Sequence, residues 1–352
     1  MRWGTILLAI IFGFILLYGA ISIVNRTGTY LIIHDMEGYQ EIYEIVPHGS
    51  SGYMVLGSTS FNGGSSCFIG LLDSAGFIVK DTILAGPSCS ASRRGDRGYL
   101  VRMFDTLLLM DEDLEALWRI YVDNKTVSDI TDLMDEYRDR YYYGFVSGNA
   151  GVVLLDTSGH ILDTFLFEGE SQVVILEVDT CGHIHLAFDD LDGRVVVMRV
   201  DDGGNVLDRI SLDFSSIFRA ERGIPVALIW RKGMLYLFAD AIREEMSSPV
   251  FVTIEEGDTA FDYGRIDGRG SVGDAIPYSG GIVVGYNMPW GGFLLRFFDG
   301  DMNPVWSLKS GKGVLMSMTE GPSGRIVMAG NVPEEGNFFS AFASEDGKWI
   351  TR

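Results

Sequence analysis

The fold of this chain is decided by residues 52–84, which read GYMVLGSTSFNGGSSCFIGLLDSAGFIVKDTIL. The stretch predicts three short strands, and a turn at residues 73–76 joins the last two of them. Polar and small residues occupy this turn because a tight hairpin needs residues that tolerate positive φ. The same pattern of an apolar run, an acidic turn and a second apolar run returns along the rest of the chain. The sequence therefore indicates one repeated β-unit.

The repeat can be counted from its turns. An apolar strand that ends in an acidic turn occurs seven times, and the acidic residues are Asp73, Asp111, Asp156, Asp201, Glu255, Asp299 and Glu345. Successive gaps are 38, 45, 45, 54, 44 and 46 residues. A period of this length with several strands per unit is typical of a propeller blade, because a sheet with two apolar faces must pack against neighbours in a ring. Unrelated hairpins in a sandwich are the alternative, and they do not explain the even period.

We therefore predict an all-β, seven-bladed β-propeller that forms one domain over residues 29–352. The blades are expected at 41–84, 85–123, 126–167, 171–212, 223–266, 271–309 and 313–352. The chain ends on a short strand, so the last blade is expected to be thin. Residues 29–35, TYLIIHD, have the composition of a strand and are expected to complete that blade and close the ring.

These motifs resemble those of a known group of proteins. GYMVLGSTS at 52–60 and CFIGLLDSAGFIVKDTIL at 67–84 resemble the repeats of bacterial and archaeal β-propellers that are grouped with quinoprotein-like and WD40-like domains. GIVVGYN at 281–287 followed by FLLRFFDGDMNPVWSL at 293–308 is similar. The resemblance covers most of residues 38–352 and implies a fold rather than a chemistry, because the matched positions are turns and core.

The tryptophans indicate whether this chain could bind the quinone cofactor of some propellers that it resembles. Quinone-cofactor propellers carry a tryptophan docking repeat, and that repeat is missing from this sequence, so no cofactor is expected. Trp118, Trp306 and Trp349 each follow a hairpin turn and are expected to pack between blades.

The N-terminus predicts a membrane anchor. Residues 3–24, WGTILLAIIFGFILLYGAISIV, contain no charged side chain. As a helix they would span roughly 30 Å, the thickness of a bilayer core. We expect residues 1–28 to be a single-pass signal anchor and linker that hold the propeller outside the cytoplasm. A cleaved signal peptide is the alternative, because residues 20–22 include small side chains after the apolar run.

Charge restricts the class of partner. The chain has 27 Lys and Arg against 48 Asp and Glu, which gives a formal net charge of −21. A surface this acidic repels phosphate backbones, so nucleic acid is not an expected partner.

The three cysteines differ in their expected positions. Cys67 opens a third strand and Cys89 follows a fourth, so both are expected near one face of the ring in adjacent blades. A disulfide between them is geometrically allowed and would suit an extracytoplasmic compartment, while two free thiols are the alternative. Cys181 lies beside a turn on the opposite face and is expected to be unpaired.

Two patterns offer metal ligands. Asp299, Asp301 and Asn303 place oxygens at alternate positions, as in a calcium loop, but the loop's glycine and glutamate are replaced by Pro304 and Ser310. Ordinary turn chemistry explains this segment better. His183 and His185 lie on one face of a strand, a spacing that can hold zinc, and the competing interpretation is two ordinary strand residues.

One face of the ring is expected to carry the longer loops, at 59–66, 86–97, 123–127, 213–222, 243–248 and 287–292. Rigid scaffolds often display binding residues on such loops. The candidates for ligand contact are the basic loop residues Arg93, Arg94, Asp96 and Arg97, and the loop tryptophan Trp290. Asn124 begins a glycosylation acceptor pattern in another of these loops.

No catalytic motif emerges. The sequence has no nucleophile elbow, phosphate-binding loop, Cys-x-x-Cys pair or His-Glu-x-x-His helix. The preferred interpretation is a membrane-anchored, extracytoplasmic propeller that binds or scaffolds a protein or a surface glycan. One alternative is a hydrolase or dehydrogenase, which would need carboxylates or histidines converging on the central channel. The other is a structural subunit of a cell-envelope complex that makes contacts through its blade edges.

Overall fold

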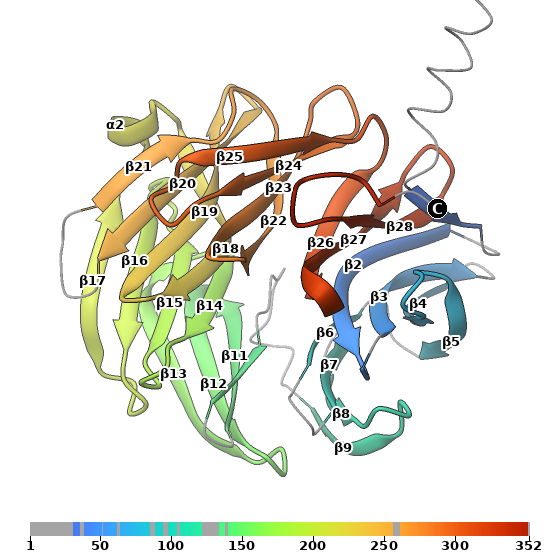
Figure 1. Cartoon of the computed structure of the whole chain (residues 1–352). Helices are drawn as coiled ribbons and strands as arrows, with labels where there is room; N and C mark the ends of the chain where they lie inside the picture. The colour runs from blue at the N-terminus through green and yellow to red at the C-terminus, as the bar shows by residue number, and fades with distance from the viewer. Residues whose placement is uncertain are drawn as a thin grey trace, which may run out of the picture.

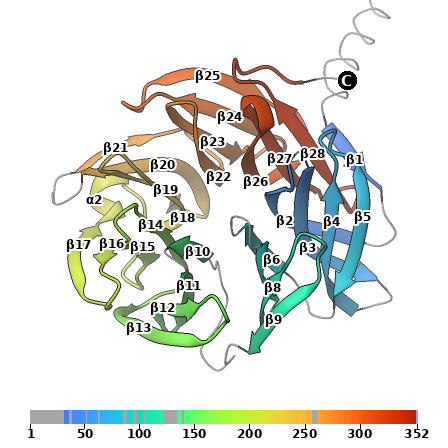
Figure 2. The same ribbon diagram turned by 60° about the horizontal axis from the view of Figure 1, so that its bottom comes forward.

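The structure is a computed structural model that describes residues 31–35, 39–50, 52–61, 64–84, 89–93, 98–103, 106–121, 134–137, 140–255 and 261–350. These residues form seven four-stranded antiparallel sheets around a common axis (Figures 1 and 2). The prediction of an all-β, seven-bladed propeller is confirmed. The predicted anchor at residues 3–24 lies outside the described residues, and within them no helix is long and apolar enough to cross a bilayer.

Each of the first six blades is a meander whose strands follow the order of the sequence. The first strand of each blade lies innermost and the fourth outermost (Figure 2). Blades one to three comprise β2 (Tyr39–His48), β3 (Gly52–Phe61), β4 (Gly64–Leu72) and β5 (Ile78–Leu84); β6 (Cys89–Arg93), β7 (Tyr99–Met103), β8 (Thr106–Met110) and β9 (Ala116–Tyr121); and β10 (Met134–Tyr137), β11 (Arg140–Ser147), β12 (Asn149–Asp156) and β13 (Ile161–Glu170).

Blades four to six comprise β14 (Val174–Val178), β15 (Ile184–Asp189), β16 (Val195–Val200) and β17 (Val206–Leu212); β18 (Arg222–Arg231), β19 (Met234–Arg243), β20 (Met246–Glu255) and β21 (Phe261–Arg265); and β22 (Ser271–Tyr278), β23 (Gly281–Asn287), β24 (Phe293–Phe298) and β25 (Pro304–Lys309). The short helix α2 (Phe214–Phe218) connects blades four and five. The Asp213 carboxylate caps its N-terminus by accepting from the backbone N–H groups of Ser215 and Ser216.

The seventh blade is built from both ends of the propeller. It contains β26 (Val314–Gly321), β27 (Arg325–Val332), β28 (Asn337–Ala343) and, as its outer strand, β1 (Leu31–His34), with the helical turn η3 (Pro322–Gly324) between β26 and β27. Leu31 pairs with Ala341, and His34 pairs with Phe338. The expectation that an N-terminal strand completes the last blade is therefore confirmed for residues 31–34.

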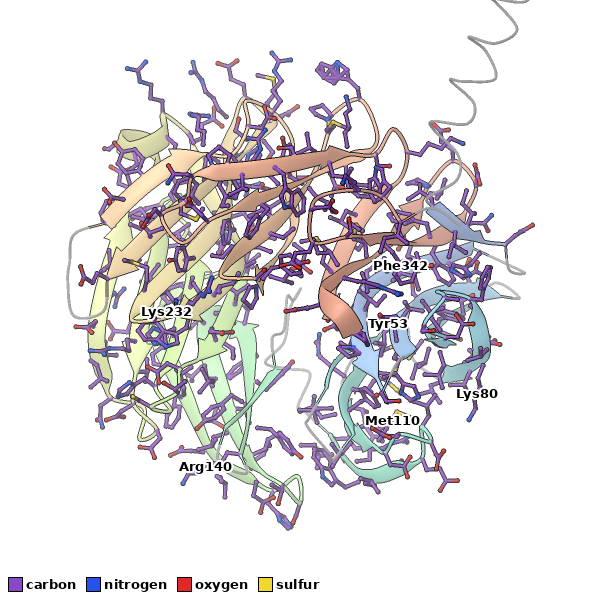
Figure 3. All side chains as sticks on the ribbon, viewed as in Figure 1. Tyr53, Lys80, Met110, Arg140, Lys232 and Phe342 are labelled. Atoms are coloured by element: carbon purple, nitrogen blue, oxygen red, sulfur yellow. A yellow bond between two sulfur atoms is a disulfide. The ribbon has the colours of Figure 1, made fainter. Side chains whose placement is uncertain are left out.

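Side chains lock this closing strand in place. His34 Nε2 lies 3.1 Å from the Ser340 hydroxyl, which in turn donates to the backbone carbonyl of Gly76 in blade one. Burial lowers the pKa of His34 to about 4, so the imidazole is neutral at physiological pH. Tyr53 and Phe342, whose ring centroids are 6.0 Å apart, meet across the same junction of blades one and seven (Figure 3).

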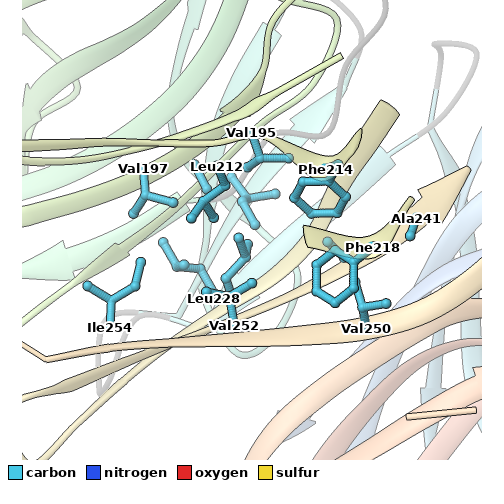
Figure 4. Close-up of a cluster of buried hydrophobic side chains, with 14 of the residues drawn as sticks. Val195, Val197, Leu212, Phe214, Phe218, Leu228, Ala241, Val250, Val252 and Ile254 are labelled. Atoms are coloured by element: carbon cyan, nitrogen blue, oxygen red, sulfur yellow. The ribbon is translucent and has the colours of Figure 1, made fainter. Parts of the chain in front are cut away.

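Apolar side chains fill the spaces between blades. Between blades four and five, the cluster in Figure 4 combines valines of β16 with residues of β18 and β20, and Phe214 and Phe218 of α2 cover one end. Burying a side chain of the Val, Leu or Phe type stabilises a fold by roughly 1.5–3 kcal/mol. Similar clusters lie at the other blade junctions, so each sheet buries on its neighbours the surface that it cannot bury alone.

In several blades, a polar side chain near the end of the second strand forms hydrogen bonds with the backbone of the next blade. Asn331 of β27 accepts from the N–H of Ile42 at 2.7 Å and donates to the carbonyl of Ile42 at 3.1 Å. The sheet register shifts directly after Ile42, which leaves its ladder groups in need of partners. Asn287 makes the same pair of hydrogen bonds with Leu315, and Asp240 accepts the corresponding bond from the N–H of Val272.

Two tryptophans of outer strands dock on the hairpin turn of the following blade. The Trp118 indole N–H donates to the carbonyl of Thr157 at 2.9 Å, and that of Trp306 to the carbonyl of Glu345 at 3.1 Å. Glycines are required beneath both rings, because a Cβ on Gly159 or Gly347 would lie 2.8 or 2.6 Å from the indole. The expectation that these two tryptophans pack between blades is confirmed.

We expect Asn331→Ala to lower the free energy of unfolding by about 2–3 kcal/mol, because it leaves a buried N–H and a buried carbonyl without their partner at the ring closure. Denaturant unfolding followed by fluorescence measures the change. Asn149→Ala is the matched control, because Asn149 is exposed at the start of β12. Equal stability of the two variants would contradict this role of Asn331.

Candidate functional site

The meander topology divides the loops between the two ends of the ring. Connections between second and third strands, and links from one blade to the next, lie at one end, which we call the connector face. Turns between first and second strands, and between third and fourth strands, lie at the other end. The loop containing Trp290 joins β23 to β24, the second and third strands of blade six, and so belongs to the connector face, as expected.

A short turn holds Trp290 at the tip of this loop. The N–H of Met288 donates to the carbonyl of Gly292 at 2.9 Å, and the N–H of Gly291 donates to the carbonyl of Met288 at 3.1 Å. These bonds close residues 288–292 and direct Trp290 outward, where 74% of its surface is exposed. A tryptophan with so little cover contributes little to folding, and its apolar ring is available for contact with another molecule.

Trp290 borders a depression of about 340 Å³ between blades five and six. The depression is lined by the β19–β20 turn with the adjoining start of β20, by the link from blade five to blade six, and by the Trp290 loop. Arg269 places its guanidinium carbon 5.9 Å from the centre of the indole, within cation–π range. Met246, which is 45% exposed, contributes a flexible apolar side chain. An aromatic ring, a cation and a methionine thus share one concave surface.

Arg93, the described residue of the basic segment, lies at the other end of the ring. The sequence prediction placed Arg93 on the same face as Trp290, and this is wrong, because β6 is a first strand that ends at Arg93 and pairs there with Tyr99 of β7. The connection from β6 to β7 therefore leaves from the end opposite the connector face. The five residues of β6, CSASR, are too few and too polar to show the alternation of apolar and polar residues that marks a strand in a sequence. The other candidates of this loop, Arg94, Asp96 and Arg97, lie outside the described residues, as does Asn124.

Cys67 and Cys89 are joined by a disulfide across the first two blades. Cys67 lies on β4 and Cys89 on β6, their Cα atoms are 5.2 Å apart, and 22 residues separate them in sequence. Both residues are buried in the cluster between these blades. Their proximity follows from the meander topology, because a third strand and the first strand of the next blade both begin at the connector face.

In the acidic segment at 299–303, the Asp299 carboxylate forms hydrogen bonds within the turn itself. Asp299 Oδ1 accepts from the backbone N–H groups of Asp301 and Asn303 at 3.0 and 2.9 Å, and the Asn303 amide donates to Asp299 Oδ2 at 3.3 Å. The backbone hydrogen bond from Asn303 is the main reason that the pKa of Asp299 lies below its usual value. The structure therefore places Asp299, Asp301 and Asn303 in a third-to-fourth-strand turn, where the first carboxylate organises the backbone.

Carboxylates near the inner strands contact the backbone of the next blade. Asp274 on β22 accepts from the N–H groups of Ala275 and of Met318, which lies on β26, at 2.7 and 2.6 Å. Burial raises the pKa of Asp274 to about 7, against the opposing effect of these hydrogen bonds. Burial likewise raises the pKa of Asp240 to about 6. Both groups hold neighbouring blades together, which accounts for them without a catalytic role.

Arg269 and Met246 were not predicted from the sequence to line one depression with Trp290. They come from a blade link and from a hairpin of another blade, so their proximity depends on the packing angle between blades. The signal that was available is the segment Gly268–Gly270, whose flanking glycines mark a loop with one cation at its centre.

We expect the stability of the wild type to fall relative to Asp274→Asn as the pH rises from about 4 to above 7. The raised pKa means that the native state holds a proton at Asp274 that the unfolded chain has already lost, so ionisation at higher pH opposes folding. The relative loss is roughly 2–4 kcal/mol. Urea unfolding at pH 4.5 and 8.5 measures it, with the exposed Asp262→Asn as control. A pH-independent difference would contradict the assignment.

Comparison with known proteins agrees with this architecture. No protein-family model and no curated protein matches the sequence. Among solved structures, the WD40 domain of Neurospora crassa Pan2 superposes with a TM-score of 0.61 at 10% identity, covering 89% of this chain and 92% of that one. BamB from Moraxella catarrhalis gives a TM-score of 0.54 at 14% identity, with 85% and 84% covered. BBS1N in complex with ARL6DN gives 0.60 at 8% identity, with 91% and 99% covered. At these identities the likeness shows the fold, so the chain has a β-propeller fold similar to those of WD40 domains and BamB.

Proposed function

We propose that this protein is a membrane-tethered, extracytoplasmic propeller that binds a protein partner through the connector face around Trp290. The observation that carries the proposal is the exposed indole beside Arg269 at the edge of the depression. Trp, Arg and Met are enriched at protein interfaces, and truncation of such residues commonly costs the most binding energy. A propeller with a similar fold, BBS1N, was solved in complex with ARL6DN.

Charge favours one kind of partner. With a net charge of −21, the chain attracts a basic partner over long distances and repels an acidic one. At the depression itself, Arg269 offers a cation to an acceptor on that partner, while Trp290 and Met246 offer apolar contact. A surface glycan is the second candidate, because an exposed indole also presents a flat apolar face to a sugar ring. An enzyme is favoured less, because the carboxylates Asp240 and Asp274 contact backbone groups.

We expect Trp290→Ala to weaken partner binding about 30-fold or more, as a loss of about 2 kcal/mol at an interface hot spot implies. Wild type and variant are used to retain proteins from detergent-solubilised native membranes, and the protein lost with the variant is then titrated against each in purified form. Tyr121→Ala is the matched control, because Tyr121 is also 74% exposed but lies at the end of the outer strand β9. Retention of the same proteins by all three forms would exclude this surface. Loss of binding after glycosidase treatment of the membranes would indicate the glycan instead.

We also expect the full chain to stay in the membrane fraction after an alkaline wash, and a chain without residues 1–28 to be released. The apolar segment at 3–24 is the physical reason.

In protein taken from native membranes, unfolded and treated with a chelator, Cys67 and Cys89 should resist alkylation until a reductant is added. Extraction of the full chain by the wash would contradict the anchor, and three reactive thiols would contradict the oxidising compartment.

A further inference from the structure

The hairpin between β14 and β15 in blade four is longer than the corresponding turns of blades five and six. In blades five and six the first and second strands are joined by two residues, 232–233 and 279–280. In blade four they are joined by five, Asp179-Thr180-Cys181-Gly182-His183. The longer turn brings a carboxylate, a thiol and an imidazole to one place at the end of the sheet opposite the connector face.

Asp179 organises this turn. Its Oδ1 accepts from the backbone N–H groups of Cys181 and His183 at 2.8 and 2.9 Å. Its Oδ2 lies 2.9 Å from His183 Nδ1 and 3.1 Å from His185 Nε2. Only 2% of Asp179 is exposed, so its carboxylate is buried, and these four neighbours of it are hydrogen-bond donors.

His185 supports the carboxylate from inside the protein. The sequence pattern paired His183 with His185 as candidate ligands, but the structure gives them different surroundings. His185 is buried and stacks on Trp230 of β18, with ring centroids 4.7 Å apart and an angle of 18° between the planes. His183 lies partly exposed in the turn, beside the exposed thiol of Cys181. The inner imidazole is therefore fixed by packing, while the outer imidazole and the thiol face solvent.

We propose that this hairpin binds a zinc-class divalent cation, with Asp179 Oδ2, Cys181 Sγ and His183 Nδ1 as ligands and His185 as a positioning residue. One donor atom of each of the three ligand residues lies within 4.8 Å of the others. Carboxylate, thiolate and imidazole are the donors that Zn²⁺ prefers, and one carboxylate with one thiolate balances its two positive charges. His185 donates to the ligating carboxylate in the way that outer groups orient metal ligands.

The proton balance of binding is simple. The metal replaces the thiol proton of Cys181, which is released to solvent, and His183 moves its proton from Nδ1 to Nε2 so that Nδ1 can bind. A site with three protein ligands keeps a fourth position open. Beside Cys181 and His183 lies a depression of about 320 Å³, lined also by Arg140, which Figure 3 labels, and by Asp202. The open position would face this space, where water or a donor from another molecule can enter.

The same chain contains a matched turn without the full donor set. Asp156, Ser158 and His160 repeat the turn in blade three, with Asp156 Oδ1 accepting from the N–H groups of both later residues and His160 Nδ1 lying 3.1 Å from Asp156 Oδ2. A serine stands where blade four has Cys181, and His160 is exposed. An Asp–His contact therefore comes with the turn itself. The thiol and the buried second imidazole distinguish the turn in blade four.

Cobalt titration tests the site. The full chain in detergent, purified without a polyhistidine tag, reduced and then freed of metal by a chelator, is titrated with Co²⁺ while its absorption spectrum is recorded. We expect one equivalent to bind with a thiolate-to-cobalt charge-transfer band, to release one proton and to be displaced by Zn²⁺. Cys181→Ser should abolish the band and weaken binding at least 100-fold. His185→Gln should keep the band but weaken binding 10- to 100-fold, as loss of an orienting group does.

His160→Gln in the matched turn serves as the control and should change neither the stoichiometry nor the band. Thermal unfolding of each variant shows whether it is folded, and Cys181→Ser is expected to fold because the side chain is exposed. The proposal is overturned if no stoichiometric binding occurs, if Cys181→Ser binds as the wild type does, or if His160→Gln removes the site. Rapid alkylation of Cys181 that Zn²⁺ does not slow would also overturn it, in favour of a reactive thiol.

Discussion

The whole structure depends on the fact that a four-stranded sheet with two apolar faces cannot bury both by itself. Every blade is covered on each side by a neighbour, so the arrangement is stable only when the first and last blades also meet. The protein solves this by giving blade seven an outer strand from the start of the chain. Separating blades one and seven would therefore require β1 to leave β28 and the buried cluster at that junction to open. The ring is therefore closed by the hydrogen bonds between β1 and β28 as well as by apolar packing.

Polar contacts give this ring a fixed register, which apolar packing alone does not. Asn331, Asn287 and Asp240 occupy the same place near the end of a second strand, and each binds the backbone directly before a register shift in the next blade. Blade four lacks this contact with the next blade, and the reason is the residue that would have to donate. The residue at this place is Asp189, but the corresponding position of blade five is Pro225, which has no N–H to donate. Asp189 instead accepts from the N–H groups of Gln172 and Val173 ahead of its own first strand.

The sequence was sufficient for the blade count and insufficient for most of the contacts between blades. Acidic turns such as the one at Asp73 are local, because one carboxylate binds the backbone two and four residues later, so their spacing could be read directly. The strand β6 was missed because five residues, CSASR, show no apolar alternation, and the face of Arg93 was assigned wrongly as a result. Trp290 was identified from its loop, whereas Arg269 and Met246 reach it only through the angle between two blades. Contacts of that kind are set by tertiary packing, which no local pattern encodes.

The turn in blade four illustrates how one local rule can yield two different outcomes. Asp73, Asp156, Asp299 and Asp179 all bind the backbone N–H groups two and four residues later, so the backbone of all four turns is nearly the same. What differs is the position in the sheet. The first three lie between outer strands, whereas Asp179 joins the innermost strand to the second, next to Trp230 of the following blade. There the carboxylate is buried and must be satisfied by side chains as well as by the backbone, which the two imidazoles do. The inner position thus adds the buried imidazole of His185 to a common turn, while the thiol of Cys181 is supplied by the sequence of this turn alone.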